Sequence, residues 1–166
     1  HLDKVIDGRP ILKGLNFQVE SGGVIGLLGE NGAGKSTLID TLLGFALPTG
    51  GSTSVFGEPS HRMSPATKGR IGYVPQQDEL MGLMNGAQLL ALVASFHERW
   101  DRELIARLIE AWSVPMDRRI GVLSGGERQK LATLAALGHR PDLLVMDEPA
   151  SGLDPIARRQ FMQAVL

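Results

Sequence analysis

The feature that most constrains the fold of this sequence is a glycine-rich loop, Gly29–Ser36, with the spacing G-x-x-x-x-G-K-[ST]. An apolar run, Val24–Leu28, precedes the loop and is typical of a strand buried on both faces of a parallel sheet. The segment that follows, Lys35–Gly44, has the apolar spacing of a helix. A strand, such a loop and a helix in this order predict an α/β fold with a phosphate-binding loop at its centre.

The chemistry of this loop favours a bound nucleoside triphosphate with Mg²⁺. Glycines let the backbone wrap closely around a phosphate, and the start of the helix adds a partial positive charge. Lys35 is expected to contact the β- and γ-phosphates, and the Ser36 hydroxyl to bind Mg²⁺. A glycine-rich turn that merely links strand to helix is the alternative. We predict nucleotide contacts from Gly29, Glu30, Asn31, Gly32, Ala33, Gly34, Lys35, Ser36 and Thr37.

A pair of carboxylates forms the second candidate site. The apolar run Leu143–Met146 predicts another buried strand, and Asp147 and Glu148 follow it directly. Ligands of open α/β sheets bind at the carboxyl ends of strands. Asp147 is therefore a candidate Mg²⁺ ligand alongside Ser36, and Glu148 a candidate base for an attacking water. By itself such a pair is usually a solvated strand end, but with the phosphate loop present the functional interpretation is favoured.

The remaining pattern predicts short strands first and helices later. We expect β structure around Leu15–Val19 with a turn at Ser21–Gly23, a hairpin element in Thr49–Glu58 and a strand in Arg70–Pro75. Helices are expected from Asn85, from Asp101, after Gly126 and near Pro155. Residues 78–120 would form a small helical insert within a single domain spanning residues 1–166.

Composition excludes several classes of function. The net charge of −1 provides no basic field that would attract nucleic acid or an anionic membrane. Cysteine is absent, which excludes disulfides and thiolate metal sites. No segment approaches the roughly 20 apolar residues that cross a bilayer, and the longest candidate is Ala87–Phe96. Any membrane-spanning part is therefore expected in another chain.

Between the two candidate sites lies Leu123-Ser124-Gly125-Gly126-Glu127-Arg128-Gln129, and with this element the chain resembles the ATP-binding subunit of ABC transporters over essentially its whole length. Gln76 is similar to the family's Q-loop glutamine, and Ser151–Asp154 resembles its D-loop. The resemblance implies a P-loop NTPase core with a mostly parallel sheet, an antiparallel β subdomain and a helical subdomain at about 78–120. It also implies a head-to-tail dimer that holds two ATP molecules.

The resemblance assigns roles to named residues. Glu148, Lys35 and Gln76 would be catalytic, and Ser36, Gln76 and Asp147 would bind Mg²⁺. The residues that would contact the nucleotide held by the other subunit are Ser124, Gly125, Gly126, Glu127 and Asp154.

The sequence departs from the family pattern at several positions. Glu127 stands where glutamine is commoner, and Ile6 falls near the position of an aromatic residue that stacks on adenine. The family's switch histidine would fall beyond Leu166, which suggests a fragment clipped at both ends. His139 precedes the carboxylate strand and is expected to end a helix beside Pro141.

Three functions remain open: a transporter ATPase, a soluble ABC protein that acts on ribosomes or DNA, and a regulatory nucleotide-binding module. We favour an ATPase of the bacterial export or multidrug type, with ATP and Mg²⁺ as cofactors. Its expected partners are a second ATPase subunit, identical or different, and a transmembrane permease, with no nucleic acid. Its expected location is the cytoplasmic face of the membrane, and the clipped chain alone is expected to hydrolyse ATP slowly or not at all.

Overall fold

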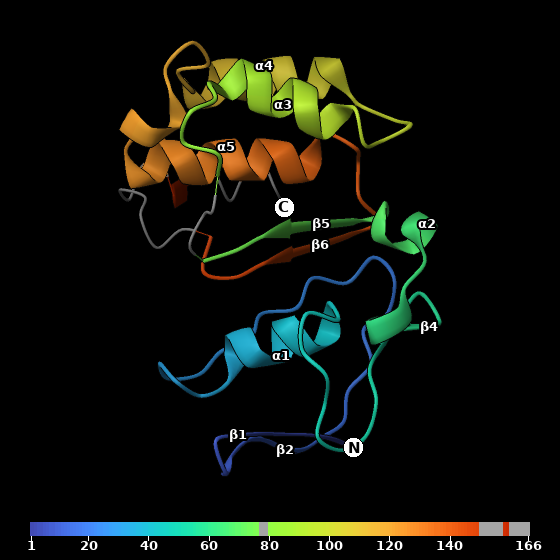
Figure 1. Ribbon diagram of the computed structural model, residues 1–166. Coiled ribbons are helices and arrows are strands. Elements are labelled where there is room, and N and C mark those ends of the chain that lie inside the picture. Colours follow the sequence, from blue (N-terminus) through green and yellow to red (C-terminus); the bar gives the residue numbers. More distant parts are fainter. Residues whose placement is uncertain (77–79, 150–157, 160–166) are drawn as a thin grey trace. The chain divides into compact units, whose positions relative to one another are not determined.

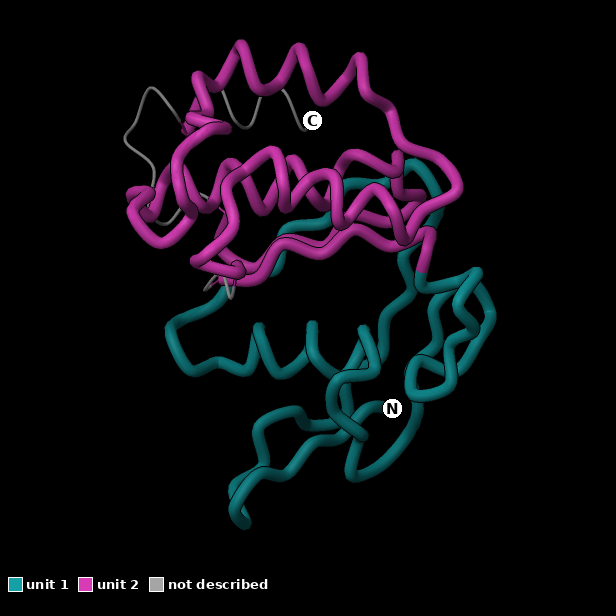
Figure 2. The backbone as a smooth tube through the Cα atoms, turned by 45° about the horizontal axis from the view of Figure 1, so that its top comes forward, with its two compact units in different colours: residues 1–68 teal, residues 69–166 magenta. Residues whose placement is uncertain are grey.

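The computed structural model describes residues 1–76, 80–149 and 158–159 (Figure 1). The chain divides into two compact units, His1–Lys68 and Gly69–Leu166, which Figure 2 distinguishes by colour. We describe each unit by itself. The expected D-loop, Ser151–Asp154, and most of the helix expected near Pro155 lie outside the described residues.

The first unit begins with an antiparallel hairpin of β1 (Leu2–Ile6) and β2 (Arg9–Leu15), in which Ile6 pairs with Arg9. The two turn residues, Asp7 and Gly8, both have positive φ (49° and 75°), as a type I′ hairpin turn requires. Sequence analysis missed this hairpin, although Asp-Gly between two strands is its usual signature.

A helix packs on this hairpin. Helix α1 (Lys35–Leu42) lies within the predicted range, and its Leu38 forms a buried apolar cluster with Leu2 and Leu12. Gly34 caps the helix in a left-handed conformation (φ 94°), which glycine adopts without strain. The hairpin expected in Thr49–Glu58 is present as β3 (Ser54–Val55) and β4 (Glu58–Pro59), and α2 (Pro65–Lys68) ends the unit.

Two predicted strands of the first unit are absent from the described residues. Val24–Leu28 forms no strand, and the side chains of Val24 and Leu28 are 80% and 96% exposed. Of Leu15–Val19 only Leu15 belongs to a strand, although the turn at Ser21 and Gly22 is present. An apolar run becomes a buried strand only when neighbouring strands pair with it, and no described segment pairs with this one.

The second unit contains a parallel strand pair with helices on it. β5 (Ile71–Val74) and β6 (Leu143–Met146) pair in register from Ile71 with Leu143 to Val74 with Met146. Both strands were predicted, and their parallel pairing agrees with the expected α/β fold. The strands are half-buried rather than covered on both faces, except that Gly72 and Val74 of β5 are buried.

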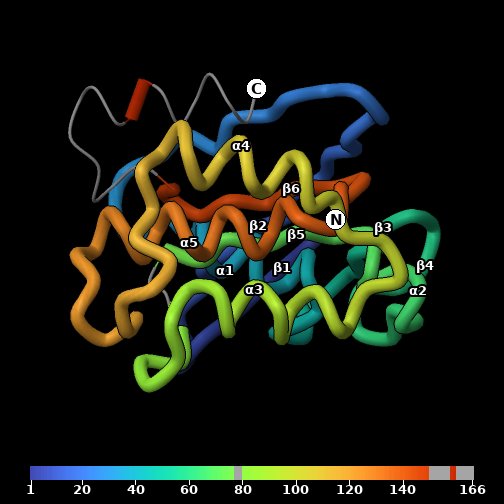
Figure 3. Tube along the Cα trace, turned by 90° about the horizontal axis from the view of Figure 1, so that it is seen from above, coloured from blue at the N-terminus to red at the C-terminus, as the bar shows by residue number. Residues whose placement is uncertain are grey.

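Three predicted helices complete this unit: α3 (Gly86–Ala94), α4 (Arg102–Trp112) and α5 (Gly125–Leu137). α5 lies against β5, and α3 and α4 lie on α5 (Figures 1 and 3). The predicted helix starts are confirmed, since Asn85, Asp101 and Ser124 each cap a helix with a side-chain oxygen. The main core lies among these helices and includes Leu89, Leu90, Ile105, Leu108, Trp112, Val114, Ile120, Leu123, Leu131 and Leu134.

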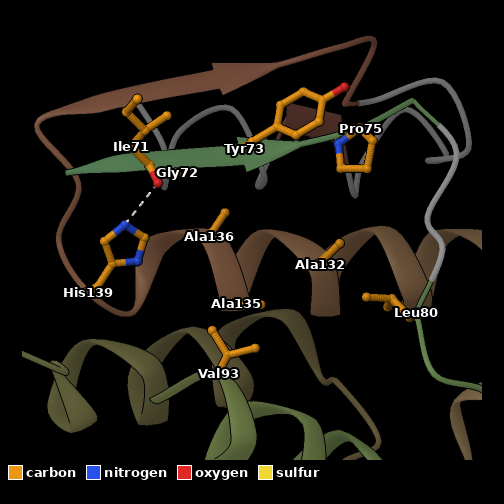
Figure 4. A pocket seen from close by; sticks show the side chains of 10 residues that line it. All are labelled: Ile71, Gly72, Tyr73, Pro75, Leu80, Val93, Ala132, Ala135, Ala136 and His139. Atoms are coloured by element: carbon orange, nitrogen blue, oxygen red, sulfur yellow. Dashed lines mark hydrogen bonds between the residues drawn. The ribbon is translucent and has the colours of Figure 1, made fainter. Parts of the chain in front are cut away.

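The α3–α4 connection and the residues after α5 meet at one end of this unit. The imidazole rings of His97 and His139 stack with centroids 4.0 Å apart, and Arg140 forms an ion pair with Asp101. His139 is buried and its Nε2 lies 3.2 Å from the carbonyl oxygen of Ile71 (Figure 4). His139 was predicted to end a helix, but α5 ends at Leu137 with Gly138 as its C-cap, so His139 lies just beyond the helix. Its contact with Ile71 connects this segment to β5.

None of the helices in the described residues is long and apolar enough to cross a membrane.

Candidate functional site

The glycine-rich loop of the first unit closes around its lysine. Lys35 Nζ donates to the carbonyl oxygens of Gly29 (2.9 Å) and Glu30 (3.1 Å). The Ala33 N–H donates to the Glu30 carbonyl (3.1 Å), which makes a tight turn before the helix. The loop therefore places an ammonium group at its centre.

The left-handed conformation of the loop depends on glycine at two positions. Gly32 and Gly34 have φ of 82° and 94°, and a Cβ at Gly34 would lie 2.9 Å from a side-chain carbon of Ile11. At the start of α1 Ser36 is exposed and Thr37 is half-buried. The first N–H groups of α1 have no carbonyl partner within the helix, so this end can bind an anion. That the loop binds phosphate stays a prediction, and Asn31 is exposed within it.

The carboxyl ends of β5 and β6 bring three predicted residues together in the second unit. Asp147 directly follows β6, is 6% exposed, and its N–H donates to the Val74 carbonyl (2.9 Å). Gln76 Nε2 donates to Glu148 Oε2 (2.9 Å), although the two residues lie 72 positions apart in the sequence. Because parallel strands end at the same edge of a sheet, this proximity follows from the β5–β6 register.

Glu148 has an unusual backbone conformation. Its φ is 49°, which is left-handed and uncommon for a residue other than glycine. Such conformations concentrate at functional sites, where the surroundings hold them in place. The conformation turns the chain immediately after the buried Asp147, and sequence analysis had no signal for it.

The Leu123–Gln129 element forms the first turn of α5. Ser124 Oγ accepts the Glu127 N–H (3.2 Å), and Glu127 Oε2 accepts the Ser124 N–H (2.7 Å), which together form a capping box. The Ser124 hydrogen bonds lower the pKa of Glu127, with smaller contributions from Arg118 and Lys130, so its carboxylate is ionised at neutral pH. Gly125 has open space around it, and a side chain there would meet nothing within 4 Å.

The residues expected to bind Mg²⁺ supply suitable donors. Mg²⁺ prefers oxygen ligands and is usually held by one or two carboxylates together with substrate phosphates and waters. Taken separately, Ser36 of the first unit and the buried Asp147 of the second each offer an oxygen donor of this kind. Within the described residues no group of three or more His, Asp or Glu side chains could hold a metal without such phosphates.

An apolar pocket of about 250 Å³ lies elsewhere in the second unit (Figure 4). Its lining comes from β5 and α5 together with Pro75, Leu80, Val93 and His139. The lining includes none of Gln76, Asp147 and Glu148, although Pro75, directly before Gln76, belongs to it.

Comparisons with known proteins agree with this geometry. Residues 12–151 match the model of a family described as ABC transporter. A protein named Nod factor export ATP-binding protein I, from Burkholderia thailandensis, is 40% identical over 95% of this chain and 53% of its own length. One of the same name from Rhizobium sp. (strain N33) is 42% identical over 93% of the chain and 53% of its own length. The chain thus spans about half the length of the curated relatives it matches.

Solved structures resemble the fold. The ATP-binding subunit of an ABC transporter superposes with a TM-score of 0.82 at 26% identity, covering 98% of this chain and 70% of that one. A dimeric ATP-binding cassette in a post-hydrolysis state bound to ADP and Pi superposes with a TM-score of 0.85 at 22% identity, covering 98% and 78%. The second likeness concerns the fold alone.

Proposed function

The chain belongs to the ABC transporter family, and from that premise we propose that its protein is the ATP-binding and ATP-hydrolysing subunit of an exporter. The main observation behind the proposal is that Gln76, Asp147 and Glu148 all lie at the carboxyl ends of two parallel strands. This edge is where α/β sheets bind ligands, and the three side chains supply an amide and two carboxylates. The printed names of the relatives, which are export ATP-binding proteins, support the exporter assignment.

In this proposal the glycine-rich loop binds the triphosphate of ATP. Gly29–Thr37 supplies backbone N–H groups, and the Lys35 ammonium exchanges its carbonyl partners for the β- and γ-phosphates. Mg²⁺, held by Ser36 and Asp147, would neutralise charge that develops on the phosphates. These groups stabilise the transition state by charge, which is the main contribution that a protein makes to phosphoryl transfer.

Glu148 then orients and polarises the attacking water. Its Oε2 accepts a hydrogen bond from Gln76, so one carboxylate oxygen is held and the side chain has a defined direction. Gln76 would link the γ-phosphate and Mg²⁺ to the helical segment that follows it. General-base assistance of this kind contributes about 10²–10⁴-fold to a rate.

A second copy or a related subunit would complete the site. The first turn of α5 (Ser124–Glu127) and Asp154, the latter outside the described residues, would contact the nucleotide bound by the partner. Loss of the γ-phosphate removes the ligand that both subunits share, so the dimer opens. The helical segment at about 78–120 would contact a separate membrane permease, and the protein would then lie on the cytoplasmic face of the membrane.

The central test is Glu148→Gln in the intact protein. Its ATP affinity should stay close to that of the wild type, while phosphate release falls by about 10²-fold or more. Glu110→Gln, at an exposed site on α4, is the matched control and should keep the wild-type rate. A Glu148→Gln protein that releases phosphate at the wild-type rate would refute the role of Glu148.

The exporter assignment has its own test, because the regulatory and ribosomal alternatives make different predictions. The intact protein should co-purify with an integral membrane protein, and its phosphate release should depend on ATP. Sedimentation with ribosomes in place of membranes would favour the ribosomal alternative. ATP binding without any phosphate release would favour the regulatory module.

A further inference from the structure

An acidic side chain lies on the first turn of α5, where the proposed function requires a phosphate to bind. Glu127 Oε2 accepts the Ser124 N–H (2.7 Å), so the carboxylate already occupies one donor of this turn. The start of a helix favours a negative charge, and an ionised carboxylate there reduces the attraction for a second anion. Binding a phosphate at this turn therefore requires that the charge of Glu127 be balanced.

Arg118 forms an ion pair with this carboxylate and lies in position to balance its charge. Arg118 Nη1 is 3.7 Å from Glu127 Oε1, and Arg118 Nη2 donates to the Val122 carbonyl (3.5 Å). The two charged side chains are 51% and 29% exposed, which places the ion pair at the surface. The guanidinium thus reaches both the carboxylate and the backbone that leads into Ser124.

The two other cations near this turn are bound to carbonyl oxygens. Arg128 Nη1 donates to the Leu123 carbonyl (2.7 Å), and Lys130 Nζ donates to the Trp112 carbonyl (3.1 Å). Among the described residues Arg118 is the cation that forms an ion pair with Glu127.

The segment that carries Arg118 is anchored to the rest of the unit. Ile120 is 1% exposed and its N–H donates to the Met84 carbonyl (2.8 Å), while the Gly121 N–H donates to the Gly82 carbonyl (3.0 Å). Arg119 forms a backbone bridge with Asn85, the residue that caps α3. The residues that directly follow Arg118 are therefore held in place by packed structure, which limits where Arg118 can lie relative to the α5 turn.

We propose that Arg118 is a positioning residue for phosphate binding: it neutralises Glu127, so that the donors of Ser124–Gly126 face the γ-phosphate of a partner subunit's nucleotide without an opposing charge. The proposal rests on the proposed function, because it assumes that this turn meets ATP bound by a second subunit. It concerns how this chain accommodates a glutamate in the turn.

A double-mutant cycle in the intact protein tests it. Sedimentation velocity would measure dimer formation at increasing concentrations of the non-hydrolysable analogue AMP-PNP with Mg²⁺. Arg118→Ala should raise the concentration for half-maximal dimer about two- to fivefold, the range for an exposed ion pair. Glu127→Gln preserves the capping box without the charge, so it should dimerise at the wild-type concentration or below. Adding Arg118→Ala to Glu127→Gln should then have no further effect.

The matched control is Arg119→Ala, which removes the same charge from the next residue and should leave dimerisation unchanged. A second measurement follows Glu127 directly by NMR as pH is lowered. Arg118→Ala should raise the titration midpoint of Glu127, whereas a merely structural role for Arg118 would leave it in place.

Equal weakening by Arg118→Ala with and without Glu127→Gln would overturn the proposal, as would an unchanged Glu127 midpoint. A wild-type protein that shows no AMP-PNP-dependent dimer, with the Glu127 midpoint still sensitive to Arg118, would instead overturn the proposed function and with it the role of the pair in phosphate binding.

Discussion

Replacing Gly72 by alanine should disrupt the contact between β5 and α5. A Cβ at Gly72 would lie 2.5 Å from the Ala136 carbonyl oxygen, 3.0 Å from Pro141 and 3.1 Å from Leu144, whereas ordinary contact begins at 3.4 Å. The nearest atom is helix backbone, which cannot rotate away as a side chain can. Overpacking of this kind usually costs about 1–3 kcal/mol. We expect Gly72→Ala to lower the free energy of unfolding by at least 1 kcal/mol.

Urea unfolding of the intact protein, followed by tryptophan fluorescence, measures this change, because Trp100 and Trp112 both lie in the second unit. Gly82→Ala is the matched control: its Cβ would meet only Gly121 at 3.6 Å, and Gly82 has no positive φ. At such a site, replacing glycine by alanine usually stabilises the folded protein by about 0.4–1 kcal/mol, because it reduces the conformational entropy of the unfolded chain. If Gly72→Ala were as stable as Gly82→Ala, the inferred close packing of β5 on α5 would be wrong.

Three further predictions concern the core, the stacked pair His97 and His139, and a helix cap. Leu131→Ala removes a fully buried side chain and should cost about 2–5 kcal/mol by urea unfolding, whereas Leu83→Ala, at an 88% exposed site, should cost less than about 0.5 kcal/mol. Burial lowers the pKa of His97 and, together with the neighbouring His97, that of His139, so the unfolded chain binds more protons and stability should fall as pH drops from 7 to 5. His139→Gln should flatten this dependence, and a pH profile as steep as that of the wild type would contradict the explanation. Asn85→Ala removes the α3 cap and should cost about 1 kcal/mol, which Asn85→Ser should largely restore.

Local signals in the sequence predicted the helices and their starts well. The side chains of Asn85, Asp101 and Ser124 each accept a hydrogen bond from the backbone N–H three residues later. The helix start can therefore be predicted from residues that are close together in the sequence. The same holds for the strands β5 and β6. The local signal for the β1–β2 hairpin is the Asp7-Gly8 turn rather than apolar alternation in its strands.

The predicted strand Val24–Leu28 failed for a different reason. A run of apolar residues favours burial, but a strand is buried only where other segments of the chain pack against it. In the described residues that segment is unpaired and exposed.

The sequence allowed the residues of the candidate site to be predicted, but not the distances between their side chains. The proximity of Gln76 to Glu148 followed from two strands of predicted type, although only their parallel register brings these side chains to 2.9 Å. Glu127 was noted as a departure from the family, whereas its pairing with Ser124 is a Ser-x-x-Glu capping box that the sequence already displays. The contact with Arg118 depends on the loop before α5 and has no local signal.

The backbone of Glu148 has a consequence for how this position can change over time. A left-handed conformation at a residue with a Cβ costs about 1–2 kcal/mol relative to glycine. Stability alone would therefore favour glycine directly after the buried Asp147, while the proposed hydrolysis requires a carboxylate there. Under the proposed function the strained glutamate is kept by selection for activity, and a lineage that no longer hydrolysed ATP would gain stability by losing this side chain.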